Sequence, residues 1–301
     1  MSETQLYNYE SVAELLAICE RESLKISEVA LRREQMLSGK PCNEIFARMQ
    51  TYYKLMRESI RNGIKITSQS PSGLSGGDAK KMLDYADSGN ALLGVDLTRL
   101  MAYAYAVLET NAQFGRIVAT PTAGSAGIVP ACLVLLEETR KIEESALTQA
   151  LFASSGVGVL IASKAFIAGA QGGCQAEVGS ASALAAAAIT EALAGTPKQV
   201  CNAATFALIN SLGLICDPIG GFVEVPCVSR NGMFAVHSYL AASLALAGVS
   251  PRVNLDDAIF AMRDVGRRMP AEFRETSRGG LAISPTACKM CKKINFRGNV
   301  F

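Results

Sequence analysis

Three cysteines lie in loops rich in glycine and proline, where their thiolates could bind a metal. Cys174 occurs in QGGCQAEVG, Cys216 in LICDPIGG and Cys227 in VEVPCVSRN. Glycine in such a loop lets a bulky group come close to the backbone. The three cysteines are 42 and 11 residues apart, which matches neither zinc fingers nor ferredoxin-type runs. Spacing alone therefore leaves open a shared metal site and three unrelated thiols.

A carboxylate lies close to the first of these cysteines. Glu177 follows Cys174 by three residues, about one turn of a helix, so both side chains could face one site. A buried carboxylate is costly unless it is hydrogen-bonded or lies near a cation. Two interpretations remain open: Glu177 orients a ligand or a substrate amine, or it accepts hydrogen bonds from nearby N–H groups.

Two loops of small residues could bind an anion. PTAGSAG, residues 121–127, lacks the lysine of a P-loop and the spacing of G-x-G-x-x-G. Its N–H groups and hydroxyls could still hold a phosphate or a small carboxylate ahead of a helix that begins near Ile128. A plain tight turn is the alternative. In SPSGLSGGDA, we expect Ser75 and Asp78 to cap the helix that follows.

The elements that must position these residues are predicted to be helices. Apolar residues recur at helical intervals, and no sustained alternating strand pattern is present, so we predict an all-α fold with glycine-rich loops. Residues 1–65 form an amphipathic helical segment and residues 66–301 the helical domain with the candidate ligands, and we expect one continuous domain. Local signals predict helix starts at Ser11, Pro41, Thr196-Pro197 and Asn254.

Composition narrows the class of protein. With 29 basic and 27 acidic residues, the net charge of +2 gives no reason to expect a nucleic acid as partner. Two uncharged runs, 145–163 and 231–251, are alanine-rich and broken by polar residues, which favours buried core helices over membrane spans. Nine cysteines and no visible signal peptide favour a reducing, cytoplasmic location. Only 19% of the residues are charged, which predicts that a partner covers part of the surface.

Several stretches together resemble one family. ATPTAGSAGIVPA, GGCQAEVGSA, GLICDPIGGFVEVPCVSRN and ETSRGGLA resemble the iron–sulfur-dependent L-serine dehydratases (L-serine ammonia-lyases), and SVAELLAICERESLKISEVALRRE resembles the start of their alpha chain. The matching stretches occur in the same order as in the family and together span nearly the whole chain. It implies an all-helical lyase that eliminates water from L-serine to give pyruvate and ammonia, in amino-acid degradation and gluconeogenesis.

The resemblance also implies roles for individual residues. Cys174, Cys216 and Cys227 would hold a [4Fe–4S] cluster in which one iron lacks a cysteine, and an open metal position acts as a Lewis acid. The family's substrate-anchoring loop corresponds to PTAGSAG, which makes Thr122, Gly124 and Ser125 the expected anchors of the amino-acid substrate.

Part of the family's machinery is not visible in this chain. The family's histidine motif belongs to a beta chain or a beta domain and does not occur here, so we expect a beta partner in a homo- or hetero-oligomer. The general base that accepts the Cα proton is not assigned, and its candidates are Glu177, Lys164 and His237. We read His237, the only histidine, first as a core or interface residue.

The chain departs from its relatives at several positions. Relatives usually read close to N-A-S-I-S-G-A where this chain has KAFIAGA, so Lys164 replaces Asn and Phe166 replaces Ser. His237 stands where relatives often have Asn or Lys. Some single-chain relatives end in a tail cysteine that caps the open iron. Cys288 is therefore an alternative fourth ligand, although we prefer to read Cys288 and Cys291 as an incidental C-x-x-C pair in a basic tail.

These departures keep other functions open. The substrate could be serine, threonine or cysteine, and elimination of sulfide from cysteine by a desulfidase is the main alternative enzyme. A pyridoxal phosphate enzyme with Lys164 as the Schiff base ranks low, because no phosphate-cradling loop in a βαβ context supports it. A catalytically silent subunit that kept the fold is the alternative outside enzymes.

Overall fold

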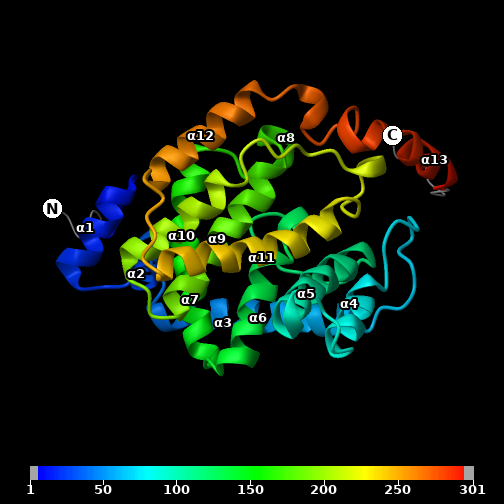
Figure 1. Cartoon of the computed structure of the whole chain (residues 1–301). Coiled ribbons are helices and arrows are strands. Elements are labelled where there is room, and N and C mark those ends of the chain that lie inside the picture. Colours follow the sequence, from blue (N-terminus) through cyan, green and yellow to red (C-terminus); the bar gives the residue numbers. More distant parts are fainter. Residues whose placement is uncertain (1–5, 295–301) are drawn as a thin grey trace.

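The computed structural model describes residues 6–294, and these residues form helices and short turns (Figure 1). Within this range one isolated bridge is the only strand-like pairing, so the predicted all-α class is confirmed. The α-helices are α1 (Val12–Glu22), α2 (Ile26–Ser38), α3 (Cys42–Gly63), α4 (Asp78–Asp87), α5 (Gly94–Ala112), α6 (Ile128–Arg140), α7 (Glu144–Lys164), α8 (Gly169–Gly172), α9 (Ser180–Ala192), α10 (Pro197–Ile209), α11 (Cys227–Leu246), α12 (Leu255–Arg268) and α13 (Pro285–Lys293).

Several helix starts follow the predicted local signals. The Thr196 hydroxyl accepts a bond from the Gln199 N–H at 3.3 Å, and the Asn254 side chain accepts from the Asp257 N–H at 2.9 Å. Ser11 caps α1 in the same way. Each cap satisfies one of the free N–H groups in the first turn of its helix. These starts were predictable because both partners lie within three residues of each other.

The predicted cap of α4 is wrong. Glu109, a buried residue of α5, accepts from the N–H groups of Gly77, Asp78 and Ala79 at 3.1, 2.7 and 3.3 Å. The Ser75 hydroxyl bonds a different carboxylate. A negative charge at a helix N-terminus is favourable, and here a distant helix supplies it in place of a local cap.

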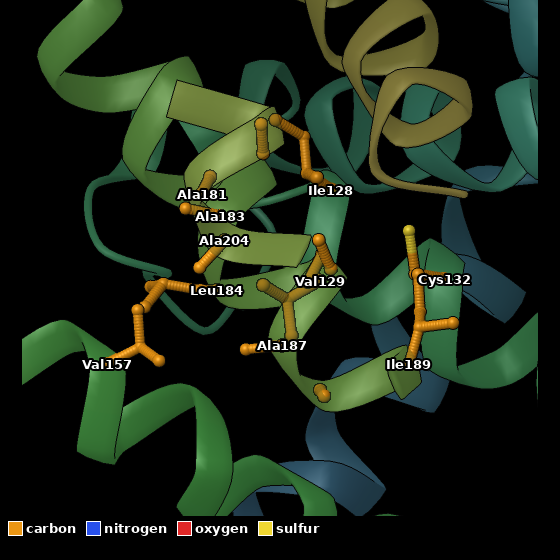
Figure 2. Close-up of a cluster of buried hydrophobic side chains, with 14 of the residues drawn as sticks. Ile128, Val129, Cys132, Val157, Ala181, Ala183, Leu184, Ala187, Ile189 and Ala204 are labelled. Atoms are coloured by element: carbon orange, nitrogen blue, oxygen red, sulfur yellow. The ribbon is translucent and has the colours of Figure 1, made fainter. Parts of the chain in front are cut away.

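The core is built around α9. This helix packs against α6, α7, α10 and α11, and every residue from Ser180 to Glu191 is buried. A helix with small or apolar side chains on all faces is expected in such a position. Figure 2 shows Ala181, Ala183 and Leu184 beside side chains of α6 and α7. The small side chains let the neighbouring helices approach closely, which makes a rigid base for the loops at the ends of α9.

α7 is the described helix that is long and apolar enough to cross a membrane. It packs against α2, α3 and α9, and 61% of its most apolar window is buried inside the protein. Its environment is therefore that of a core helix. The uncharged run 231–251 falls largely in α11, which lies across one face of the molecule over α5, α9 and α10 (Figure 1).

Candidate active site

The three loop cysteines are buried on three different segments. Cys174 lies between α8 and the π-helical turn Gln175–Gly179 that leads into α9, Cys216 lies in the loop after α10, and Cys227 begins α11. Their side chains are 2%, 3% and 8% exposed. Single π-helical turns inside helices are rare and occur frequently at functional sites.

The thiols interact with one another. Cys174 and Cys216 share a hydrogen bond, which lowers the pKa of Cys174, and a nearby Arg230 acts in the same direction. The same bond, followed by burial, raises the pKa of Cys216. Burial raises the pKa of Cys227 to about 12, and the charge at Cys174 adds to this effect. Cys174 and Cys216 therefore form an interacting pair of thiols beside Arg230.

The backbone of Cys216 is held by a segment from the end of the chain. Its N–H donates to the Phe273 carbonyl at 2.8 Å, and its carbonyl accepts from the Glu275 N–H at 2.8 Å. Together these bonds make an isolated parallel bridge between Cys216 and Arg274. Glu275, the first residue of the ETSRGGLA motif, thus helps to fix a cysteine that lies 59 residues before it in the sequence.

Two glycines leave room for this arrangement. A Cβ added at Gly169 would lie 2.8 Å from Cys216 Sγ and 2.9 Å from a Glu177 carboxylate oxygen. Gly173 has φ +75°, and a Cβ there would lie 2.5 Å from Met269 Sδ. Both positions require glycine, Gly169 for space and Gly173 for space and backbone conformation.

Arg230 connects the thiols with the neighbouring loops. Its guanidinium donates to the Asp217 carboxylate at 2.8 Å and to the Ile215 carbonyl at 2.9 Å, and its positive charge lowers the pKa of Cys174. The second oxygen of Asp217 accepts from the Leu281 N–H at 2.8 Å. A buried thiolate needs a cation and hydrogen-bond donors, and Arg230 supplies both.

Glu177 lies between the cysteines and the proposed anchoring loop. Its side chain is 8% exposed, and burial raises its pKa against the opposing effects of the Thr122 hydroxyl and the Gly169 N–H. A Cβ on Gly124 would lie 3.3 Å from one of its oxygens. Ser125 is fully buried, and its hydroxyl lies 3.2 Å from that of Thr122. Glu177 thus lies beside both the anchoring loop at Gly124 and the backbone at Gly169, and its role in orienting a ligand or a substrate amine stays a prediction.

Sequence reasoning missed Asn231, which joins the anchoring loop to the cysteine helix. Its side-chain N–H groups donate to the carbonyls of Gly124 at 2.8 Å and Cys227 at 2.9 Å. Its carbonyl oxygen accepts from the Gly127 N–H at 3.0 Å. Both donors and the oxygen of this fully buried amide are used, and they tie the anchoring loop to the first turn of α11. No local pattern marks such a residue, because its partners lie about a hundred positions earlier.

Glu275 was also missed. Its side chain is exposed, its φ is +62°, and its negative charge acts on Glu177, Cys216 and Cys227. A non-glycine residue with positive φ is uncommon and often marks a functional or strained position. Glu275 therefore adds a second carboxylate at the edge of the candidate site.

The donor set fits an iron–sulfur cluster. Cys174, Cys216 and Cys227 come from three segments, Arg230 supplies positive charge, and Gly169 has no side chain that would collide with the Cys216 sulfur. Among the residues described, no three His, Cys, Asp or Glu side chains are placed to hold a single metal ion. The thiolates of a cubane cluster bind different iron atoms, so they need not converge on one point. These three cysteines could therefore hold such a cluster.

Comparison with known proteins identifies the family. A family model described as serine dehydratase alpha chain matches residues 21–282. The chain belongs to this family. It is 43% identical over 287 residues to the probable L-serine dehydratase, alpha chain, of Bacillus subtilis (strain 168), with 95% of each chain covered. It is 40% identical over 277 residues to the L-serine dehydratase, alpha chain, of Peptoniphilus asaccharolyticus, which covers 92% of this chain and 95% of that one.

Some members of the serine dehydratase family are longer than this chain. L-serine dehydratase TdcG of Escherichia coli (strain K12) is 38% identical over 285 residues, which are 92% of this chain and 62% of that protein. The relatives named alpha chain thus match this chain almost end to end, whereas TdcG contains a further part that this alpha-type chain does not match.

Two predicted base candidates of this serine dehydratase alpha chain have partners outside the cysteine cluster. Lys164, at the end of α7, makes an ion pair with Asp256 of α12 at 2.5 Å. His237, on α11, bonds the Ala207 carbonyl at 3.0 Å and contacts Phe234 edge-on. The structure does not bring either residue to the contacts that Glu177 makes, and their catalytic roles stay predictions.

The two C-terminal cysteines lie on α13. Cys288 is exposed, and its sulfur points to the Ile283 carbonyl at 3.6 Å. Cys291 is half-buried, and a Cβ on Gly220 would lie 3.5 Å from its sulfur. Gly220 belongs to the loop between Cys216 and Cys227, so α13 packs over the outer side of that loop. The role of Cys288 as a fourth ligand stays a prediction.

Proposed function

We propose that this serine dehydratase alpha chain carries the site for β-elimination of water from L-serine, with a [4Fe–4S] cluster on Cys174, Cys216 and Cys227. The observation that carries the proposal is the position of Glu177. In a chain of this family, its carboxylate lies close to Gly124 of the anchoring loop and to Gly169, the glycine that packs against the Cys216 sulfur.

The reaction requires loss of a weakly acidic Cα proton and of hydroxide from Cβ. The product is aminoacrylate, which tautomerises to an imine, and water then converts the imine to pyruvate and ammonia. When bound, the cluster supplies an open iron that acts as a Lewis acid for the departing hydroxyl. The protein must supply orientation, charge balance and exclusion of bulk water.

The anchoring loop is suited to hold the substrate carboxylate. Thr122, Gly124 and Ser125 directly precede α6, and the N-terminus of a helix favours negative charge. Glu177 beside this loop is suited to hold the substrate ammonium. A cation there offsets the burial that raises the pKa of Glu177, and so favours the ionised carboxylate. The two contacts would fix which face of Cα is presented to a base.

The proton acceptor is then Glu177 itself or a group from a partner chain. A Glu177→Gln variant separates these roles. An amine-orienting Glu177 predicts mainly a higher KM, because an interaction with the bound substrate is lost. A proton-accepting Glu177 predicts a fall in kcat by about a hundredfold or more.

A beta chain is the proposed partner, and the cytoplasm is the proposed location. Two relatives carry the name alpha chain, and TdcG matches this chain over only 62% of its own length. Both facts support a second component that is separate here.

The test is anaerobic purification with and without a beta chain, followed by counting of iron and sulfide and by assays of product release. We expect a bound cluster and pyruvate from serine, with threonine and cysteine as comparison substrates. Cys216→Ser should lose cluster and activity, whereas Cys19→Ser, a change at another buried thiol, should keep both. Full activity of Cys216→Ser would refute the ligand set.

The same assay distinguishes the alternatives. Sulfide release from cysteine in excess of pyruvate release from serine would indicate a desulfidase. No turnover of any of the three amino acids, with a beta chain present, would indicate a silent subunit. The ion pair of Lys164 with Asp256 gives that lysine a structural partner, so the pyridoxal phosphate alternative gains no support.

A further inference from the structure

A second buried carboxylate near the cysteines, Glu224, is held by three serine hydroxyls. Glu224 is 5% exposed. One of its oxygens accepts from Ser70 at 2.6 Å and from Ser75, and the other accepts from Ser72 at 2.5 Å. The serines belong to the loop between α3 and α4, about 150 positions earlier in the chain. Both loops lie on the right-hand side of Figure 1, the serine loop in cyan and the Glu224 loop in yellow.

The serine loop is folded so that its hydroxyls reach one point. The Ser70 N–H donates to the Ser75 carbonyl at 2.8 Å, and the Gly73 N–H donates to the Ser70 carbonyl at 2.9 Å. The Leu74 N–H donates to the Ser72 hydroxyl at 3.0 Å. These bonds close residues 70–75 on themselves, and the three hydroxyls are left to bond Glu224. Hydrogen bonds to an ionised carboxylate are stronger than those between neutral groups.

Glu224 lies in the turn that leads directly to Cys227. Its carbonyl accepts from the Val228 N–H at 2.8 Å at the start of α11, and the next residue, Val225, accepts from the Ile219 N–H at 2.9 Å. The carboxylate and the backbone of one residue thus connect the serine loop to the first turn of the cysteine helix. A shift of Glu224 would move the backbone that carries the Cys227 thiol.

A different carboxylate holds the other end of the serine loop. Glu109 of α5 bonds the N–H groups of Gly77, Asp78 and Ala79. Within residues 6–294, the Glu109 carboxylate bonds these three N–H groups and not the turn before Cys227. The serine loop is therefore attached by two buried carboxylates, of which Glu224 alone also belongs to a cysteine segment.

We propose that Glu224 is a positioning residue that fixes the Cys227 thiol by clamping the serine loop, residues 70–75, against the turn before α11. The proposal rests on the proposed function only where Cys227 is taken as a cluster ligand. The clamp itself consists of contacts within the protein and does not depend on that assignment. Without an acceptor at position 224, three hydroxyls lose their partner and the turn before Cys227 opens more often.

The test compares three variants of the full-length, reduced apoprotein. Glu224→Met keeps the length of the side chain but removes the acceptor. Glu224→Gln keeps a polar group that can both donate to and accept from serine hydroxyls. Glu109→Met is the matched control at the other end of the serine loop. The readout is the rate at which iodoacetamide alkylates Cys227, measured by peptide mass spectrometry.

We expect Glu224→Met to raise the Cys227 rate by about tenfold or more, since labelling of a buried thiol requires local opening. Glu224→Gln should restore a rate close to that of the unchanged protein. Glu109→Met should lower the unfolding midpoint without this increase at Cys227. An unchanged rate in Glu224→Met, or an equal increase in Glu109→Met, would overturn the proposal. If Glu224→Met does not fold, the Ser70→Ala, Ser75→Ala double variant is expected to show the same increase.

A second measurement separates this proposal from the proposed function. Iron loss to a chelator is followed for the cluster-loaded protein, and Glu224→Met is expected to lose iron faster than Glu109→Met. A protein that takes up no iron would contradict the proposed function and leave the labelling result valid. A loaded and active protein with unchanged labelling and unchanged iron loss in Glu224→Met would contradict the clamp alone.

Discussion

Replacement of Asn231 by alanine should destabilise the protein and loosen the candidate site together. The fully buried Asn231 amide makes three hydrogen bonds, to the Gly124 and Cys227 carbonyls and from the Gly127 N–H. Each net contribution is about 1 kcal/mol, and buried groups left without a partner cost more. We therefore expect a loss of about 3 kcal/mol in the free energy of unfolding.

Urea unfolding of the reduced apoprotein, followed by far-UV circular dichroism, measures this loss. Asn210→Ala is the matched control, because that amide makes a single bond to the Phe206 carbonyl at the end of α10. The control should lose about 1 kcal/mol or less. In the assembled enzyme, Asn231→Ala should also raise the KM for serine, since Asn231 holds the carbonyl of Gly124.

Asn231→Asp is an informative third variant. The carboxylate can still accept from Gly127 but cannot donate to the two carbonyls, and it introduces a buried charge. It should be less stable than Asn231→Ala at neutral pH. If the free energy of unfolding of Asn231→Ala is within about 0.5 kcal/mol of that of the unchanged protein, the three bonds do not stabilise the protein by the expected amount.

Three further predictions concern other parts of the chain. Lys164→Met should leave kcat and KM of the assembled enzyme unchanged. It should lower the free energy of unfolding by at most about 1 kcal/mol, because the ion pair of Lys164 with Asp256 is partly exposed. A loss of product formation would support a catalytic role for Lys164. Burial raises the pKa of Glu191 above 4.5, so the folded protein disfavours its charged form and loses stability as the pH rises from 4.5 through the folded pKa. Glu191→Gln removes that loss. The urea midpoint of the variant should therefore exceed that of the unchanged protein by more at about pH 8 than at about pH 5. The same difference at both pH values would contradict the raised pKa of Glu191. Brief treatment with iodoacetamide should alkylate the exposed Cys288 before the six buried cysteines, and early labelling of Cys201 would contradict the described burial.

Local structure was predictable where the cause is local. Thr196 and Asn254 cap helices through bonds to residues three positions on, so the sequence pattern contains the whole interaction. The all-α class followed in the same way from helical periodicity. The cap of α4 was not predictable, because Glu109 lies about thirty positions away and a local pattern offered Ser75 and Asp78 instead.

The candidate site was predictable only in part. Cys174 and Glu177 could be associated from their spacing, but their relation to Thr122 depends on how α6 and α9 pack. Asn231 and Glu224 carry no signal of their own, because asparagine and glutamate are ordinarily surface residues. Their importance comes from partners a hundred or more positions away, which only the folded chain brings together.

The bridge at Cys216 has a consequence for the order of events during synthesis. Cys216 depends on Phe273 and Glu275, and the neighbouring Asp217 depends on the Leu281 N–H. A nascent chain that has exposed Cys174, Cys216 and Cys227 still lacks the segment that aligns the second of them. The helices that pack around α9, namely α6, α7, α10 and α11, all leave the ribosome before this segment does. Assembly of the proposed cluster should therefore succeed only after residues 273–281 have left the ribosome.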